Sequence, residues 1–241
     1  MNEFIRTQML LGKESIKKLK NTSVVVFGIG GVGSYVCEAL ARSGVGRFML
    51  VDNDTVSESN INRQLVALHS TIGRYKTEVM KERIKDINPE CTVETKNIFY
   101  SPENGECIEF VNYDYIVDCI DTVTSKLYII EKAYKMNVPI ISSMGTGNKL
   151  NASEFLISDI SKTKICPLAR VMRRELKNRQ IPKLKVLWST EEPIKPQVLK
   201  DENNNKLPPG SVSFVPSVAG LLIAGEVIKD IINIKKDGKN I

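Results

Sequence analysis

Cysteine is scarce in this chain of 241 residues, and its few cysteines are not spaced as metal ligands or as a disulfide framework. Their number is odd and no two form a Cys-x-x-Cys pair, which argues against a network of disulfides and against a four-cysteine zinc site. A reducing cytoplasm fits this usage best. The five positions are Cys37, Cys91, Cys107, Cys119 and Cys166.

Long apolar runs are also missing. The first twenty residues are charged and amphipathic, with no stretch typical of a signal peptide or a membrane span, so we expect no membrane partner. Hydrophobic residues make up 42% and charged residues 26% of the chain, as in ordinary globular proteins. A chain of this length can bury a sizeable core without a disulfide or metal staple.

Short apolar runs alternate with helical spacings, and this alternation predicts an α/β fold with a Rossmann-like, doubly wound, mainly parallel sheet. A helix is expected over 3–20, followed by a strand at 23–27, a helix at 34–44 and a strand at 47–52. Further helices are expected at 76–87, 125–136, 167–180 and 217–232, and further strands at 91–100, 114–120, 138–144, 154–160 and 184–190.

Four glycines follow the first strand in the pattern Gly-x-Gly-Gly-x-Gly, at Gly28, Gly30, Gly31 and Gly33. Glycines allow a sharp turn and bring a phosphate or ribose close to the amides at a helix N-terminus. Asp52 ends the second strand, where a carboxylate can accept hydrogen bonds from ribose hydroxyls. The strand, the glycines, the helix and the acid together predict a nucleotide site.

The residues beyond this fingerprint favour a triphosphate over a dinucleotide. Arg and Lys side chains can neutralise phosphates, and a carboxylate at the end of a strand can hold Mg²⁺. A Walker A loop is absent, so the chain is not a P-loop protein. The residues concerned are Asn60, Arg63, Gln64, Lys76 and Asp121.

As an ordered set, the glycine pattern, VDNDTVSESNINRQ, GRYK and VDCIDTVTSK resemble the E1-like adenylating superfamily over about residues 6–145. The resemblance implies ATP and Mg²⁺ as cofactors and a homodimer in which Arg6 reaches the partner's triphosphate. It implies that Asp52 binds the ribose and that Asp121 holds the metal. The other implied nucleotide contacts are Asp54, Asn60, Arg63, Gln64 and Lys76; Arg6, Arg63, Lys76 and Asp121 are the implied catalytic residues.

The second half of the chain, at 153–190 and 210–229, resembles the tRNA threonylcarbamoyladenosine dehydratase branch of that superfamily. The resemblance implies that ATP activates the substrate's own carboxylate as an acyl-adenylate, which then cyclises. It leaves a sulfur-relay helper protein open as a partner. We expect one domain over 1–241, with a nucleotide-binding half at 1–150. The remainder, 151–241, would face the tRNA and contain a mobile loop at 191–210.

Positive charge gathers in one segment, independently of the resemblance. Nine Lys and Arg residues and a single acid lie between Lys162 and Lys185, although the net charge of the whole chain is only +6. At helical spacing, the cations of 167–180 share one face, which can meet phosphates while the apolar face packs on the domain. The expected tRNA contacts are Arg170, Arg173, Arg174 and Lys177.

Three other functions fit parts of the sequence. An activator of a sulfur-carrier protein would share the adenylating half, and Cys166 would then be its candidate acyl acceptor. A nicotinamide oxidoreductase would share only the glycine fingerprint and leave Arg63, Lys76 and Asp121 without roles. A non-catalytic RNA-binding protein would not need the matched charged residues.

Overall fold

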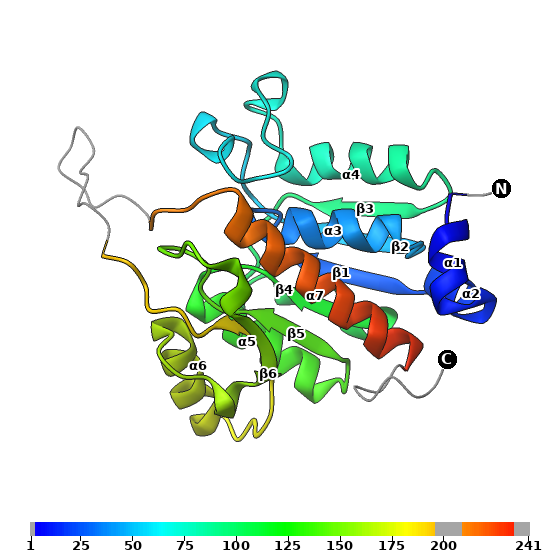
Figure 1. Cartoon of the computed structure of the whole chain (residues 1–241). Helices are drawn as coiled ribbons and strands as arrows, with labels where there is room; N and C mark the ends of the chain where they lie inside the picture. Colours follow the sequence, from blue (N-terminus) through cyan, green and yellow to red (C-terminus); the bar gives the residue numbers. More distant parts are fainter. Residues whose placement is uncertain (1–2, 196–208, 234–241) are drawn as a thin grey trace.

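A seven-stranded sheet forms the centre of the molecule, and helices cover both of its faces (Figure 1). The computed structural model describes residues 3–195 and 209–233. The strand order is β3-β2-β1-β4-β5-β7-β6, and neighbours are parallel except β6 and β7. The strands are β1 (Ser23–Phe27), β2 (Arg47–Val51), β3 (Thr92–Lys96), β4 (Tyr115–Asp118), β5 (Ile140–Ser143), β6 (Phe155–Asp159) and β7 (Lys185–Ser189). The predicted doubly wound α/β fold is confirmed.

Both faces of the sheet are buried, as expected for parallel strands. In β1, Val24 and Val26 pack into the core beneath α3 and α7, while Val25 and Phe27 point to the opposite face and meet Phe110. The α-helices are α1 (Ile5–Leu11), α2 (Lys13–Lys20), α3 (Gly33–Arg42), α4 (Lys76–Ile87), α5 (Val123–Lys135), α6 (Pro167–Asn178) and α7 (Phe214–Ile232). No helix in the described ranges is long and apolar enough to cross a membrane.

The last helix crosses directly over the helix that follows the glycine pattern. Gly220 makes this approach possible, because a Cβ there would lie 2.4 Å from the carbonyl oxygen of Val32. Figure 1 shows α7 (orange to red) lying across α3. As a result, the start of α7, around Pro216, reaches the glycine pattern at the carboxyl end of β1.

Several predicted boundaries were wrong. The expected helix over 3–20 is two helices, because Gly12 adopts φ 82° and ψ 161° between them. The strand expected at 91–100 ends at Lys96, and the last helix begins at Phe214 rather than Ser217. The loop expected at 191–210 is irregular at both described ends, and 196–208 lie outside the described residues.

Candidate nucleotide site

A cleft opens at the carboxyl ends of the strands, where the strand order reverses between β1 and β4. In open α/β sheets this is the place where ligands bind. Ten of the side chains and glycines that the sequence predicts for the nucleotide site line this cleft. They are Gly28, Gly30, Gly31, Asp52, Asp54, Asn60, Arg63, Gln64, Lys76 and Asp121.

The glycine turn packs tightly against the end of β4. Gly28 has φ +84°, and a Cβ there would lie 2.9 Å from both the carbonyl carbon and the oxygen of Cys119. Gly33 does not line the cleft. A Cβ on Gly33 would lie 1.8 Å from the carbonyl oxygen of Gly28, so this glycine lets α3 start close to the strand. Any side chain at either position would push the turn away from β4.

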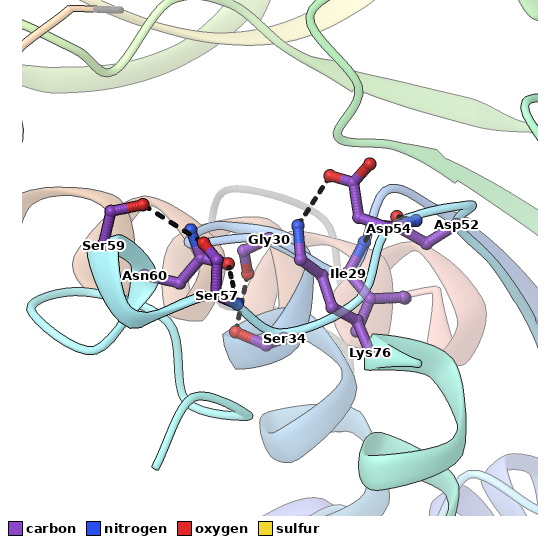
Figure 2. Close-up of polar contacts among 9 residues, drawn as sticks. All are labelled: Ile29, Gly30, Ser34, Asp52, Asp54, Ser57, Ser59, Asn60 and Lys76. Carbon is purple, nitrogen blue, oxygen red and sulfur yellow. Dashed lines mark hydrogen bonds and ion pairs between the residues drawn. The ribbon is translucent and has the colours of Figure 1, made fainter. Parts of the chain in front are cut away.

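Asp52 lies just after β2 and organises the turn beside it (Figure 2). Its carboxylate accepts hydrogen bonds from the backbone N–H of Ile29 at 2.6 Å and of Asp54 at 2.8 Å. Burial raises the pKa of the Asp52 carboxyl above its ordinary value, although these two N–H groups and the Lys76 ammonium act in the opposite direction. The two N–H groups and Lys76 therefore only partly offset the cost of burying the negative charge of Asp52. A ligand hydroxyl that donates a hydrogen bond to this carboxylate would stabilise the charge further.

Lys76 supplies a positive charge to the cleft although its side chain is only 6% exposed. It opens α4, and its Nζ binds Oδ2 of Asp54 at 2.7 Å, as Figure 2 shows. Asp54 is 58% exposed, so this ion pair reaches from the protein interior to the solvent. The pair holds the ammonium group at the wall of the cleft.

The short 3-10 turn at Glu58–Asn60 places an arginine and two amides at the other wall. The buried Asn60 accepts a hydrogen bond from the backbone N–H of Ser57 at 3.2 Å, which fixes the turn. The Arg63 guanidinium donates to the Ser59 carbonyl and to Asn62 Oδ1, each at 2.9 Å. It has no carboxylate partner among the described residues, so its charge is free to meet an anion.

Asp121 follows β4 and is exposed in the cleft, with no hydrogen bond or ion pair to any described residue. No group of three metal-ligating side chains exists in the described part of the chain. This donor set fits Mg²⁺, which is commonly bound by one or two carboxylates while substrate phosphates and waters complete its coordination. It does not fit a metal held by protein ligands alone.

The C-terminal half closes the cleft over the glycine turn. Asn148 donates its backbone N–H to the Gly210 carbonyl at 2.7 Å and accepts from the Gly210 N–H through Oδ1 at 2.8 Å. The Asn62 amide donates to the Ser211 carbonyl at 2.9 Å. Pro209, Ser211 and Pro216 consequently line the same cleft as the glycines.

Sequence reasoning missed part of the lining. Ile98–Tyr100 follow β3 and Thr146–Gly147 follow β5, so the rule that ligands bind at carboxyl strand ends could have found them. Ser125 lies in the first turn of α5. Its buried Oγ and the Oε1 of Gln64 have no hydrogen-bond partner among the described residues. A buried polar atom without a partner costs free energy, so both can gain from a polar ligand.

Other predicted residues lie outside the cleft. Arg6 is exposed on α1, which packs near the amino ends of β1 and β2, at the other end of the sheet (Figure 1). Cys166 is 3% exposed and packs in the core beneath α6. The burial of this thiol does not favour a role as acyl acceptor.

The four basic residues expected on α6 differ from one another. Arg170 and Lys177 are exposed and have no ion pair among the described residues, whereas Arg174 pairs with Glu175 at 3.2 Å. Arg173 is half-buried and donates to both oxygens of Thr163, including the carbonyl at 2.7 Å. Arg173 therefore anchors the segment before α6 and is less available to a partner than the sequence suggested.

The chain is similar to known proteins along nearly its whole length. Residues 4–240 match the sequence model of the ThiF family. The tRNA threonylcarbamoyladenosine dehydratase of Bacillus subtilis is 46% identical over 96% of this chain and 95% of that protein. The crystal structure of the Escherichia coli enzyme, TcdA, in complex with ATP superimposes with a TM-score of 0.87 at 32% identity, over 96% of this chain and 94% of that one. The adenylyltransferase and sulfurtransferase UBA4 of Vanderwaltozyma polyspora is 38% identical over only 57% of this chain and 31% of that protein.

The unpartnered hydroxyl of Ser125 predicts an unusual response to mutation. Ser125→Ala should leave the free energy of unfolding of the ligand-free protein unchanged or raise it by up to about 1 kcal/mol, because it removes a buried hydroxyl with no hydrogen-bond partner among the described residues. Ser142→Ala is the matched control, since Ser142 is equally buried but donates to Asp118 at 2.6 Å. That control should lose about 2 kcal/mol in urea unfolding. Equal losses for the two variants would contradict the absence of a partner for Ser125.

Proposed function

The chain belongs to the ThiF family, and we propose that it is an ATP-dependent tRNA threonylcarbamoyladenosine dehydratase. The single observation that carries this proposal is the match to the B. subtilis dehydratase across 96% of the chain at 46% identity. The cleft supports it, because ten of the residues expected for ATP lie around one cavity. The substrate is a tRNA whose modified adenosine carries a threonylcarbamoyl side chain with a free carboxylate.

Two displacements account for the reaction. The substrate carboxylate attacks the α-phosphate of ATP and pyrophosphate leaves, which forms an acyl-adenylate. The ureido group of the same side chain then attacks the activated carbonyl, and AMP leaves with one of the former carboxylate oxygens. The sum is loss of one water from the tRNA. Because the second attack is intramolecular, it has a large effective molarity and needs no protein nucleophile, consistent with the buried Cys166.

The described residues bind and orient ATP for this attack. Asp52 accepts hydrogen bonds from the ribose hydroxyls, and the glycine turn lets the phosphates approach the amides at the start of α3. Arg63 and Lys76 stabilise the negative charge that develops on the transferring group. Bound Mg²⁺, held by Asp121, would supply further electrostatic stabilisation of the phosphates.

We also propose that two copies of the chain form a homodimer. Exposed apolar side chains on α1 (Met9, Leu10) and on α7 (Phe214, Leu221) support this, because such side chains favour burial against a partner. Met9 and Leu10 are 76% and 75% exposed and share their helix with Arg6. A partner that covers α1 therefore also reaches Arg6, which would contact the triphosphate of the other copy.

We further propose a cytoplasmic location. The five free cysteines agree with it, because cysteines stay reduced in that compartment.

The proposed reaction predicts a product that is lighter by one water. Threonylcarbamoylated tRNA incubated with this protein, ATP and Mg²⁺ should yield the cyclised nucleoside, measured by mass analysis after digestion. Asp121→Ala should abolish product, because the expected Mg²⁺ ligand is lost, whereas Asp86→Ala, an exposed acid on α4, should retain it. Unchanged nucleoside from a protein that exchanges pyrophosphate with a carrier protein would instead identify a sulfur-carrier activator.

The same assay tests the role of Arg6 across a dimer. Arg6→Ala and Asp121→Ala should each be inactive alone. An equimolar mixture that has exchanged subunits should regain about a quarter of the wild-type activity, because half of the dimers then contain one complete site. No recovery on mixing would contradict a contribution of Arg6 to the other copy's site.

We propose that the exposed cations of α6 and of the segment before it bind the tRNA backbone. Lys162, Lys164, Arg170 and Lys177 are exposed and have no ion pair among the described residues. A cluster of unpaired cations favours a polyanion, because each phosphate contact releases condensed counterions. Phosphate contacts position a nucleic acid without reading its sequence.

This surface predicts a specific change in salt dependence. The double variant Arg170→Gln/Lys177→Gln should bind tRNA more weakly, and the slope of log affinity against log salt should fall by about one for each cation removed. Lys13→Gln/Lys17→Gln, on α2 at the other end of the sheet, is the control of equal charge change. If both double variants lose the same slope, the contact is not at α6.

A further inference from the structure

A fully buried ion pair lies beneath the end of the cleft that Asp121 lines. Lys126 and Asp118 are both 0% exposed, and Lys126 Nζ lies 2.9 Å from Asp118 Oδ2. Ser142 donates to the same carboxylate oxygen at 2.6 Å. Asp118 is the last residue of β4, and Lys126 lies in α5, so the pair spans the loop that connects these two elements.

The pair holds the backbone of that loop at one residue. Lys126 Nζ donates to the carbonyl oxygen of Ile120 at 2.8 Å, and the N–H of Ile120 lies 3.3 Å from Asp118 Oδ1. Both polar groups of this peptide residue are thus bound by the ion pair. The next residue is Asp121, whose carboxylate has no partner of its own among the described residues. The place of Asp121 in the cleft therefore depends on Ile120.

Stability alone does not explain this arrangement. The free-energy cost of removing two charges from water offsets much of their electrostatic attraction. Proteins in which a buried ion pair is replaced by apolar side chains are therefore often as stable as the original. Lys132, six residues further along α5, is buried without an ion pair to any described residue. It is 6% exposed and donates to the carbonyl oxygens of Gly105 and Ile108, at 2.6 and 2.9 Å. Lys132 binds no carboxylate of the described residues, and it does not line the cleft.

The loop also contacts the phosphate-binding side of the cleft. The Cys119 N–H donates to the Phe27 carbonyl at 2.8 Å, and the Cys119 carbonyl is the group that leaves no room for a Cβ on Gly28. A shift of the loop would therefore move Asp121 relative to the glycine turn. The distance between these two parts decides whether a metal ion can bridge the carboxylate and the phosphates.

We propose that Lys126 is a positioning residue for the reaction: by binding Asp118 and the Ile120 carbonyl, it places Asp121 where it can hold the metal ion of MgATP. This inference rests on the proposed function, in which Asp121 is the Mg²⁺ ligand. Lys126 touches neither the nucleotide nor the metal. Lys126 increases the affinity that ATP gains when Mg²⁺ is present. This contribution is distinct from any effect of Lys126 on the stability of the fold.

Nucleotide binding to the full chain separates these two contributions. Titration calorimetry would compare AMP, ATP in the presence of EDTA, and ATP with Mg²⁺. Lys126→Met should weaken MgATP binding by about 10- to 100-fold, as loss of a group that orients a metal ligand typically does. AMP and metal-free ATP should be affected far less. Equal losses for all three nucleotides, or no loss for any, would overturn the proposal.

Two further variants keep the test decisive if Lys126→Met folds poorly. Asp118→Asn/Lys126→Met removes both charges and so avoids leaving a lone buried carboxylate. It should unfold at a urea concentration close to that of the wild type yet keep the defect in MgATP binding. Recovery of both stability and MgATP affinity in this double variant would show a purely structural pair. Lys132→Met, the matched buried lysine on the same helix, should lose stability without a selective loss of MgATP.

Asp121→Asn distinguishes failure of this inference from failure of the proposed function. If Asp121→Asn loses the gain from Mg²⁺ and the Lys126 variants keep it, the positioning role alone is wrong. If Asp121→Asn also keeps the gain, Asp121 is not the metal ligand and the positioning role of Lys126 falls with that assignment. The proposed function fails only if the protein forms no cyclised nucleoside in the assay described above.

Discussion

The close contact between the glycine turn and the end of β4 is the constraint on which the rest of the cleft depends. Gly28 lies against the Cys119 carbonyl with no room for a side chain, and Gly33 lies against Gly28 in the same way. Each contact fixes the start of α3 relative to the loop that carries Asp121. The cleft lies where the strand order reverses between β1 and β4, with the start of α3 on one side and the Asp121 carboxylate on the other.

The charged groups around this contact are held by different means. Lys76 and Lys126 are both buried, but Lys76 pairs with an exposed carboxylate at the cleft wall and Lys126 with a buried one below it. Arg63 and Asp121 lack partners of opposite charge among the described residues. The cleft thus contains preorganised charges that fit the proposed ligands, a polyphosphate and its metal ion. In the proposed reaction the substrate supplies both nucleophiles, its carboxylate and its ureido group, so the protein needs no nucleophile of its own.

The sequence predicted the sheet and ten residues of the cleft, among them its glycines and charged side chains, because both follow from local rules. Apolar runs such as SVVVF and the glycine pattern identify β1 and its turn, and the polar residues after β2 and β4 lie at the carboxyl ends of strands. The boundary at Gly12 was missed because a helical apolar pattern continues across the break. Pro209, Ser211 and Pro216 were missed because they reach the cleft only through hydrogen bonds and packing between distant parts of the chain, which leave no local pattern. Helical spacing alone also could not show that Arg173 donates to the Thr163 carbonyl, because Thr163 lies outside α6; a tRNA contact by Arg173 stays a prediction.

The central claim, that the cleft uses ATP to activate the substrate's own carboxylate, can be tested by following oxygen. The tRNA would carry ¹⁸O in the carboxylate of its threonylcarbamoyl group, and AMP would be analysed by mass spectrometry after the reaction. The account predicts that AMP acquires one ¹⁸O, because the carboxylate oxygen that bridges carbon and phosphorus leaves with the phosphate. AMP without label, with the cyclised nucleoside formed, would contradict an acyl-adenylate and require another role for ATP.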